Sequence, residues 1–116
     1  MSKQLDLSIL HNTEGTSDKV YIVQLAKHDD LNFSVRTYWG RRTANPYTTR
    51  EMNFDNEAIA RRFGEDILRK KVREGYRQIA RNLEAEVTAK LARYVAMPNF
   101  IRAKKDKVEE FRMIEL

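Results

Sequence analysis

Residues 19–41 read KVYIVQLAKHDDLNFSVRTYWGR, two strand-like runs joined by a short polar segment. Residues 20–25 are apolar on both faces and rich in β-branched side chains, which is typical of a central strand. Residues 33–39 have the two-residue alternation of a strand, which stops at Gly40. Because only a turn at residues 28–32 separates the two runs, they predict an antiparallel hairpin.

The segments on either side extend this pattern. Residues 5–9 alternate apolar and polar side chains, and residues 11–18 are rich in Asn, Thr, Gly, Ser and Asp. These features predict a half-buried strand followed by a loop. Downstream, residues 41–46 form a polar loop, and residues 47–54 are interpreted as a fourth strand.

A helix is expected to follow the fourth strand. Asp55 is a suitable N-cap, the helical pattern runs to about Arg73, and Gly75 is a typical C-terminal glycine. The apolar stripe, expected to be buried on the sheet, consists of Ile59, Ala60, Phe63, Ile67, Leu68 and Val72.

A second helical pattern occupies the last third of the chain. Apolar residues recur every four positions, at Ile79, Leu83, Val87, Leu91 and Val95, and Pro98 ends the run. Residues 100–116 are compatible with either a helix or a strand. We therefore expect an α+β fold: an antiparallel sheet of four to five strands with one helix packed across it, plus a C-terminal helical extension. The expected boundaries are 1–76 for the sheet domain and 77–116 for the extension.

Composition narrows the classes of function. The 116 residues contain no cysteine and carry a net charge of +5. Residues 55–81 alone hold eight basic and five acidic residues, so the middle of the chain is the basic part. A basic balance favours polyanionic partners. With no signal-like or membrane-spanning apolar run, we expect a soluble cytoplasmic protein, associated with the nucleoid if it is bacterial.

The tripeptide Trp39-Gly40-Arg41 at a strand end, with Tyr21-Ile22-Val23-Gln24-Leu25 on the preceding strand, resembles the WGR domain. This domain occurs in poly(ADP-ribose) polymerases and in small bacterial proteins. Other segments agree with the resemblance: Leu5-Asp6-Leu7, residues 17–21, Phe54 with Glu57-Ala58 and Phe63, and Lys71-Val72-Arg73-Glu74-Gly75-Tyr76. It covers about residues 3–76. The loop at residues 42–47 departs from the family, because it contains no glycine.

The resemblance implies a DNA-binding site around the tripeptide. Trp39 would stack on a base or sugar at a nucleic-acid end, or else fill the core at the end of the sheet. Gly40 would permit a positive φ or a close backbone approach. Arg41 and Arg42 would contact phosphate, and a basic helical turn would add Arg69, Lys70, Lys71 and Arg73. The alternative for these cations is a solvated surface paired with nearby acidic residues.

No enzymatic motif is found: the sequence has no Gly-rich phosphate loop, no pair of metal ligands and no nucleophile elbow. His11 and His28 are interpreted as isolated surface or turn residues. We therefore expect a non-catalytic module without cofactor or metal that binds DNA ends, nicks or single strands. The alternative is a protein-interaction or adaptor module, in which Leu83, Val87, Leu91 and Val95 form a dimer seam or dock on a partner. The other interpretation of this apolar stripe is that the helix folds back and completes the core of its own chain.

Overall fold

The computed structural model describes residues 2–95. Its elements, in chain order, are β1 (Lys3–Asn12), β2 (Lys19–Asp29), β3 (Asn32–Arg41), β4 (Thr48–Phe54), α1 (Glu57–Arg73), β5 (Arg77–Gln78) and α2 (Arg81–Val95). The chain divides into two compact units, Met1–Gln78 and Ile79–Leu116, which are described separately below.

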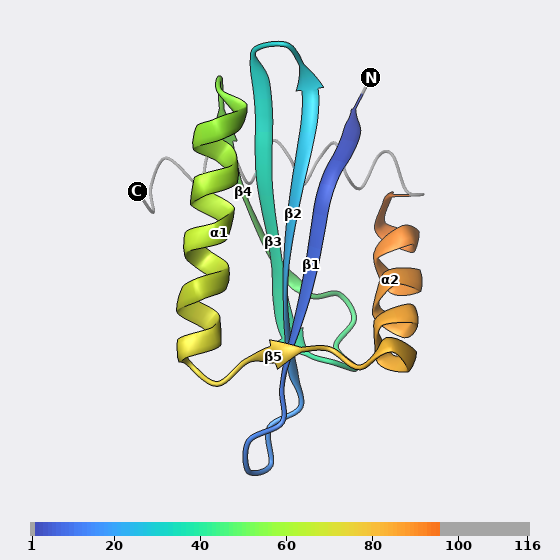
Figure 1. The fold of residues 1–116 in the computed structure, drawn as a ribbon. Helices are drawn as coiled ribbons and strands as arrows, with labels where there is room; N and C mark the ends of the chain where they lie inside the picture. The colour runs from blue at the N-terminus through green and yellow to red at the C-terminus, as the bar shows by residue number, and fades with distance from the viewer. Residues whose placement is uncertain (1, 96–116) are drawn as a thin grey trace. The chain divides into compact units, whose positions relative to one another are not determined.

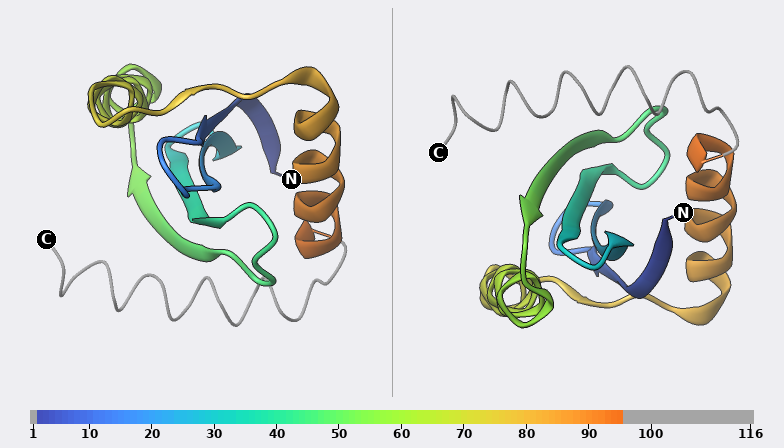
Figure 2. Two further views of the ribbon diagram at one scale, coloured as in Figure 1. Left: turned by 90° about the horizontal axis from the view of Figure 1, so that it is seen from below. Right: turned by 90° about the horizontal axis from the view of Figure 1, so that it is seen from above.

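The first unit is an antiparallel sheet with α1 on one face (Figure 1). The strand order is β4-β3-β2-β1-β5, so the β2–β3 hairpin predicted from residues 19–41 lies at its centre. Viewed along the strands, the sheet is clearly curved (Figure 2). The predicted α+β class is confirmed, with five strands, one helix packed on the sheet and a second helix after it.

Small residues bring α1 close to the sheet. Ala60 and Gly64 are its buried residues, and a Cβ added at Gly64 would lie only 3.4 Å from Val23 Cγ1 and 3.9 Å from Val35 Cγ1. Ala60 joins the core formed with Val23, Leu25, Phe33 and Val35. The helix therefore packs along its line of small residues.

This packing corrects two expectations about α1. Ile59 and Val72 were expected to be buried, but they are 55% and 45% exposed. Phe63 and Ile67 are partly buried at the rim of the core, where the Phe63 ring lies 5.2 Å from the Phe54 ring. The close approach at Ala60 and Gly64 rotates the larger apolar side chains away from the centre of the contact.

The beginning of α1 also differs from the prediction, whereas its end agrees. The N-cap is Asn56 rather than Asp55, and its Oδ1 accepts a hydrogen bond from Ile59 N at 3.1 Å. The backbone N–H groups of the first helical turn have no partner within the helix, and one N-cap side chain accepts from one of them. Because Asn56 takes this role, the helix begins one residue later than expected. Gly75 follows the helix with a φ of 106°, as expected for a C-terminal glycine.

An ion pair on the sheet face opposite α1 links β3 to β4. Arg36 donates from Nε (2.9 Å) and Nη2 (2.6 Å) to Glu51 Oε1, and the Glu51 side chain is 1% exposed. Tyr38 also lies on this face, and its hydroxyl donates to Gln24 Oε1 at 3.2 Å. A buried pair of this kind holds the two strands in one register, which matters for Arg50, the neighbour of Glu51.

In the second unit, α2 confirms the helix predicted around Leu83–Val95. Val87 and Leu91 are buried, and Leu83 is partly buried. The predicted stop at Pro98 and the ambiguous segment at residues 100–116 lie outside the described residues. No helix in residues 2–95 has the length and hydropathy needed to cross a bilayer.

Candidate nucleic-acid interface

Two aromatic rings stack on the sheet face that carries α1. Tyr21 on β2 and Trp39 on β3 are directly opposite in the antiparallel register. Their ring centroids are 5.8 Å apart and their planes differ by 14°. Both side chains are partly exposed. Because neighbouring side chains on one face stand side by side, the register itself produces this stack.

The last turn of α1 closes one end of this aromatic pair. Lys71 Nζ lies 4.6 Å from the centre of the Tyr21 ring and 5.9 Å from that of Tyr76. The Tyr76 ring meets Tyr21 edge-on at 6.2 Å. Burial raises the pKa of the Tyr76 phenol, and Lys71 opposes that rise, so the phenol is neutral at physiological pH. Lys71 also donates to Glu74 Oε1 at 3.1 Å.

Arg50 lies at the other end of the row. It comes from β4, on the opposite side of β3 from Tyr21, and its Cζ lies 5.5 Å from the centre of the Trp39 ring. Arg50 is paired with Thr37 in the β3–β4 register, two residues before Trp39 on the same face. The order across the sheet is therefore Lys71, Tyr21, Trp39, Arg50, a cation at each end of two stacked rings.

Two further cations lie just beyond the aromatic pair. Lys19 and Arg41 are opposite each other, two positions along the same strands from Tyr21 and Trp39. Both are exposed, and neither forms an ion pair within residues 2–95. The predicted site residue Arg41 is therefore available to a ligand, together with Lys19, which sequence reasoning did not select.

The neighbouring Arg42 has a different environment. Its Nε lies 3.2 Å from both carboxylate oxygens of Asp18, its Nη2 lies 3.1 Å from Oδ2, and its backbone N donates to Asp18 O at 2.8 Å. His11 Nε2 lies 2.6 Å from Asp18 Oδ1. Hydrogen bonds from His11 and then Arg42 hold the pKa of the Asp18 carboxyl below its usual value. Tyr47, whose hydroxyl donates to Arg42 O at 2.8 Å, is 1% exposed.

These contacts hold the β1–β2 loop against the loop that follows the tripeptide, so Arg42 stabilises the loops beside the candidate site. They also correct the interpretation of both histidines as isolated. The His11 side chain is 11% exposed and pairs with Asp18, and His28 bridges the hydroxyls of Ser2 (2.6 Å) and Ser34 (2.8 Å). A carboxylate seven residues away from His11 reaches it only because β1 and β2 are paired.

Gly40 lies in the middle of the tripeptide, two residues before Arg42. Its φ is 146°, which L side chains rarely adopt, whereas a Cβ there would meet Ala44 and Tyr47 at ordinary distances of 3.6 and 3.7 Å. Of the two roles considered for this glycine, the positive φ is the one the structure shows.

The basic turn of α1 is only partly assembled with the aromatic row. Lys71 belongs to the row, whereas Lys70 and Arg73 are exposed and form no ion pair within the described part of the chain. Arg69 is paired with Asp66 one turn back. Because these cations lie at the helix C-terminus, the helix dipole stabilises them.

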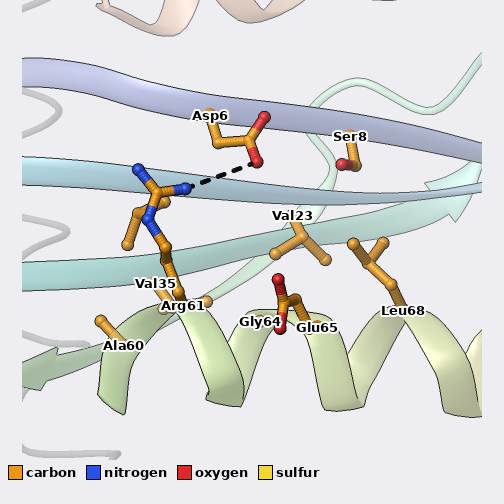
Figure 3. A pocket seen from close by; sticks show the side chains of 10 residues that line it. Asp6, Ser8, Val23, Val35, Ala60, Arg61, Gly64, Glu65 and Leu68 are labelled. Carbon is orange, nitrogen blue, oxygen red and sulfur yellow. Dashed lines mark ion pairs between the residues drawn. The ribbon is translucent and has the colours of Figure 1, made fainter. Parts of the chain in front are cut away.

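A small pocket lies between α1 and the sheet, next to β1 (Figure 3). Asp6 and Ser8 on β1 face Arg61 and Glu65 on α1, and the ion pair between Asp6 and Arg61 spans 4.0 Å. The cavity of about 30 Å³ has room for a water molecule or two and not for a base or a cofactor. Residues 2–95 also contain no group of three His, Cys, Asp or Glu side chains that could hold a metal ion.

Sequence reasoning missed Lys19 and Arg50 and did not assign Tyr21 to the site. A partial signal for Tyr21 was present, since Tyr21 and Trp39 belong to one predicted hairpin, but they lie opposite each other only because the register shifts between Lys27 and Asp29. No such signal was available for Arg50, because the loop before β4 has no predictable turn geometry.

Comparison with protein families supports the resemblance seen in the sequence. A sequence model of the WGR domain matches residues 8–82. Comparisons with curated proteins and with solved structures returned no match. The WGR domain is a non-catalytic module known for binding nucleic acid. With this match over more than half of its length, the chain belongs to the WGR domain family.

Proposed function

We propose that this protein binds DNA at ends and breaks, using the Tyr21–Trp39 pair for base or sugar contact and the surrounding cations for phosphate. The observation that carries the proposal is the partly exposed stack of two rings with a cation at each end. Aromatic stacking tolerates any base, and it needs a free base face, which a continuous duplex does not offer.

The cations divide into two groups under this proposal. Arg41 and Lys19 are exposed beside the rings and are expected to contact phosphates directly, as are Lys70 and Arg73 on the last turn of α1. Arg42 and Arg69 each face a carboxylate, so their expected contribution to binding is smaller. Within the described residues, the side chains of the candidate site suit contact with the phosphates and the ends of DNA rather than recognition of base sequence.

The test compares linear DNA with the same DNA as a closed circle, which has no ends. Trp39→Ala is expected to weaken binding to ends by about 1–3 kcal/mol and to leave the closed circle almost unaffected. Trp39→Phe should retain part of the end preference, because the smaller ring still stacks. Arg41→Ala should weaken both forms and reduce the slope of log K against log salt by up to about one unit.

Two controls make the result interpretable. Arg62→Ala removes the same charge as Arg41→Ala, but Arg62 is an exposed residue of α1 about 13 Å along the helix axis from Lys71. Each variant is also checked by thermal unfolding. Equal loss of end and circle binding in a folded Trp39→Ala protein would contradict the stacking role, and unfolding of that variant would show that Trp39 acts as a core residue.

A second function is favoured by the apolar four-residue spacing in α2, where Leu83 is only partly buried. Val87 and Leu91, two of the four residues of the predicted seam, are buried, so in this proposal the partly buried Leu83 makes the contact with a second copy of the chain or with another protein. Such an interface is held by apolar contact, so it should persist at salt concentrations that release DNA. The two functions can coexist in one chain.

A further inference from the structure

Lys71 is the cation of the basic turn that already has partners within the protein. Its Nζ lies 4.6 Å from the centre of the Tyr21 ring and donates to Glu74 Oε1 at 3.1 Å. The Lys71 side chain is 22% exposed, whereas the preceding Lys70 is exposed and forms no ion pair within the part of the chain that the structure describes. Two adjacent lysines therefore differ in the charge that they offer to a ligand, because a carboxylate balances that of Lys71.

The stability of α1 does not account for the acid in this pair. Glu74 is the C-cap residue of the helix, at the end where the helix dipole favours cations and opposes carboxylates. A lysine followed by a glutamate is also the less favourable order for an ion pair along a helix. What the carboxylate does achieve is to hold the Lys71 ammonium against Tyr21, the ring that stacks on Trp39.

We propose that Glu74 withholds Lys71 from DNA, so that Lys71 positions Tyr21 instead of binding a phosphate. This inference rests on the proposed function of the site. A phosphate at the ammonium would lie close to the Glu74 carboxylate, and juxtaposed like charges repel each other.

The consequence concerns specificity, which is a difference between two affinities. Phosphates occur all along a duplex, whereas a free base face occurs only at an end or a break. Withholding one cation therefore lowers the affinity for continuous DNA more than the affinity for ends. Glu74 determines specificity by weakening the contact that every DNA offers, and Lys71 supports the ring contact that only ends offer.

Glu74→Gln tests the first half of this inference, because it removes the charge and keeps the shape of the side chain. The freed ammonium should gain a phosphate and steepen the slope of log K against log salt by up to about 0.9, which is about eight-fold in affinity over a ten-fold change in salt. The gain should be larger on a closed circle than on linear DNA, so the preference for ends falls. The Tm should be unchanged or higher, since an acid has been removed from the helix C-terminus.

Lys70→Met and Lys71→Met test the second half as a matched pair of adjacent substitutions. Lys70→Met should flatten the salt slope by up to about 0.9. Lys71→Met should leave the slope unchanged and weaken binding to ends by about two- to five-fold at every salt concentration. The near-UV circular dichroism of the Tyr21–Trp39 stack should weaken in Lys71→Met and be retained in Lys71→Arg, which keeps a cation over the ring. Lys71→Gln replaces Lys71→Met if the latter is poorly folded.

Two controls isolate the ion pair. Glu65→Gln removes the same charge from an exposed position of α1, about 13 Å along the helix axis from Glu74, and should leave the slope unchanged. Glu74→Gln placed in the Lys71→Met background should no longer steepen the slope.

Three results would overturn the inference: an unchanged slope in Glu74→Gln, a steepening that Glu65→Gln reproduces, or a flattening in Lys71→Met as large as one phosphate contact. If the natural protein shows no preference for ends, the proposed function fails and the role in specificity with it. A preference for ends together with an unchanged slope in Glu74→Gln refutes this inference alone.

Discussion

Replacing Gly75 with alanine is expected to destabilise the sheet-bearing unit by about 1–3 kcal/mol, chiefly through the backbone. Gly75 follows α1 with a φ of 106°, a conformation that side chains of the L series rarely adopt. A Cβ at this position would also lie 2.5 Å from Glu14 Oε1 and 2.8 Å from Glu14 Cδ. Glu14 is exposed and its carboxylate ends a flexible side chain, so it can move aside at small cost. The backbone of residue 75 cannot relieve its positive φ in the same way, because the turn after α1 requires it.

Thermal unfolding of four proteins tests this reasoning: the natural chain, Gly75→Ala, Glu14→Ala and the double variant. A loss of 1–3 kcal/mol corresponds to a fall in Tm of about 5–20 °C for a unit of this size. The coupling between the two substitutions should remain below about 0.5 kcal/mol. A change in Tm under about 2 °C for Gly75→Ala would show that the turn tolerates a side chain. Full recovery in the double variant would assign the cost to the collision with Glu14.

Two other predictions concern the anchored loop and the second helix. Hydrogen bonds from His11 and Arg42 hold the pKa of the Asp18 carboxyl below its usual value of 3.8. The ionised carboxylate therefore stabilises the fold above pH 3.8, and this stabilisation is lost as the pH falls through the lowered pKa. The difference in Tm between the natural protein and Asp18→Asn should therefore be largest above about pH 5 and shrink below about pH 3, and a difference that persisted at low pH would contradict an ionic origin. If α2 forms a protein seam, Leu83→Asp should abolish self-association measured by sedimentation at high salt while DNA binding is retained; a chain that is monomeric with and without the substitution would exclude the dimer.

The hairpin that carries the candidate site could be predicted from local pattern. Strand alternation and a turn near residue 30 define the β2–β3 hairpin, but Tyr21 lies opposite Trp39 only because the register shifts between Lys27 and Asp29, which the alternation does not predict. The glycine after α1 likewise follows from a local requirement, the positive φ at a helix end. These features depend only on the periods of helix and strand and on the conformational freedom of single residues.

The packed face of α1 could not be obtained in the same way. Helical periodicity identifies a broad apolar stripe, but the sheet selects the line of closest approach within it. Ala60 and Gly64 occupy that line, since small residues allow the helix axis to come nearer the strands, and Ile59 is left 55% exposed at the rim. The choice depends on the shape of the opposing surface, which lies far away in the chain.

The local architecture therefore follows from sequence pattern: the strands of the hairpin, the helix that follows them, the basic character of the middle of the chain and the resemblance to WGR domains. Which cations lie against the aromatic rings depends on the tertiary fold. It places Arg50 over Trp39, Lys71 over Tyr21, and Arg42 on Asp18 instead of beside them. The physical reason is that side-chain partners are set by strand register across loops of irregular length, and a shift of one residue in register would send Arg50 to the opposite face of the sheet.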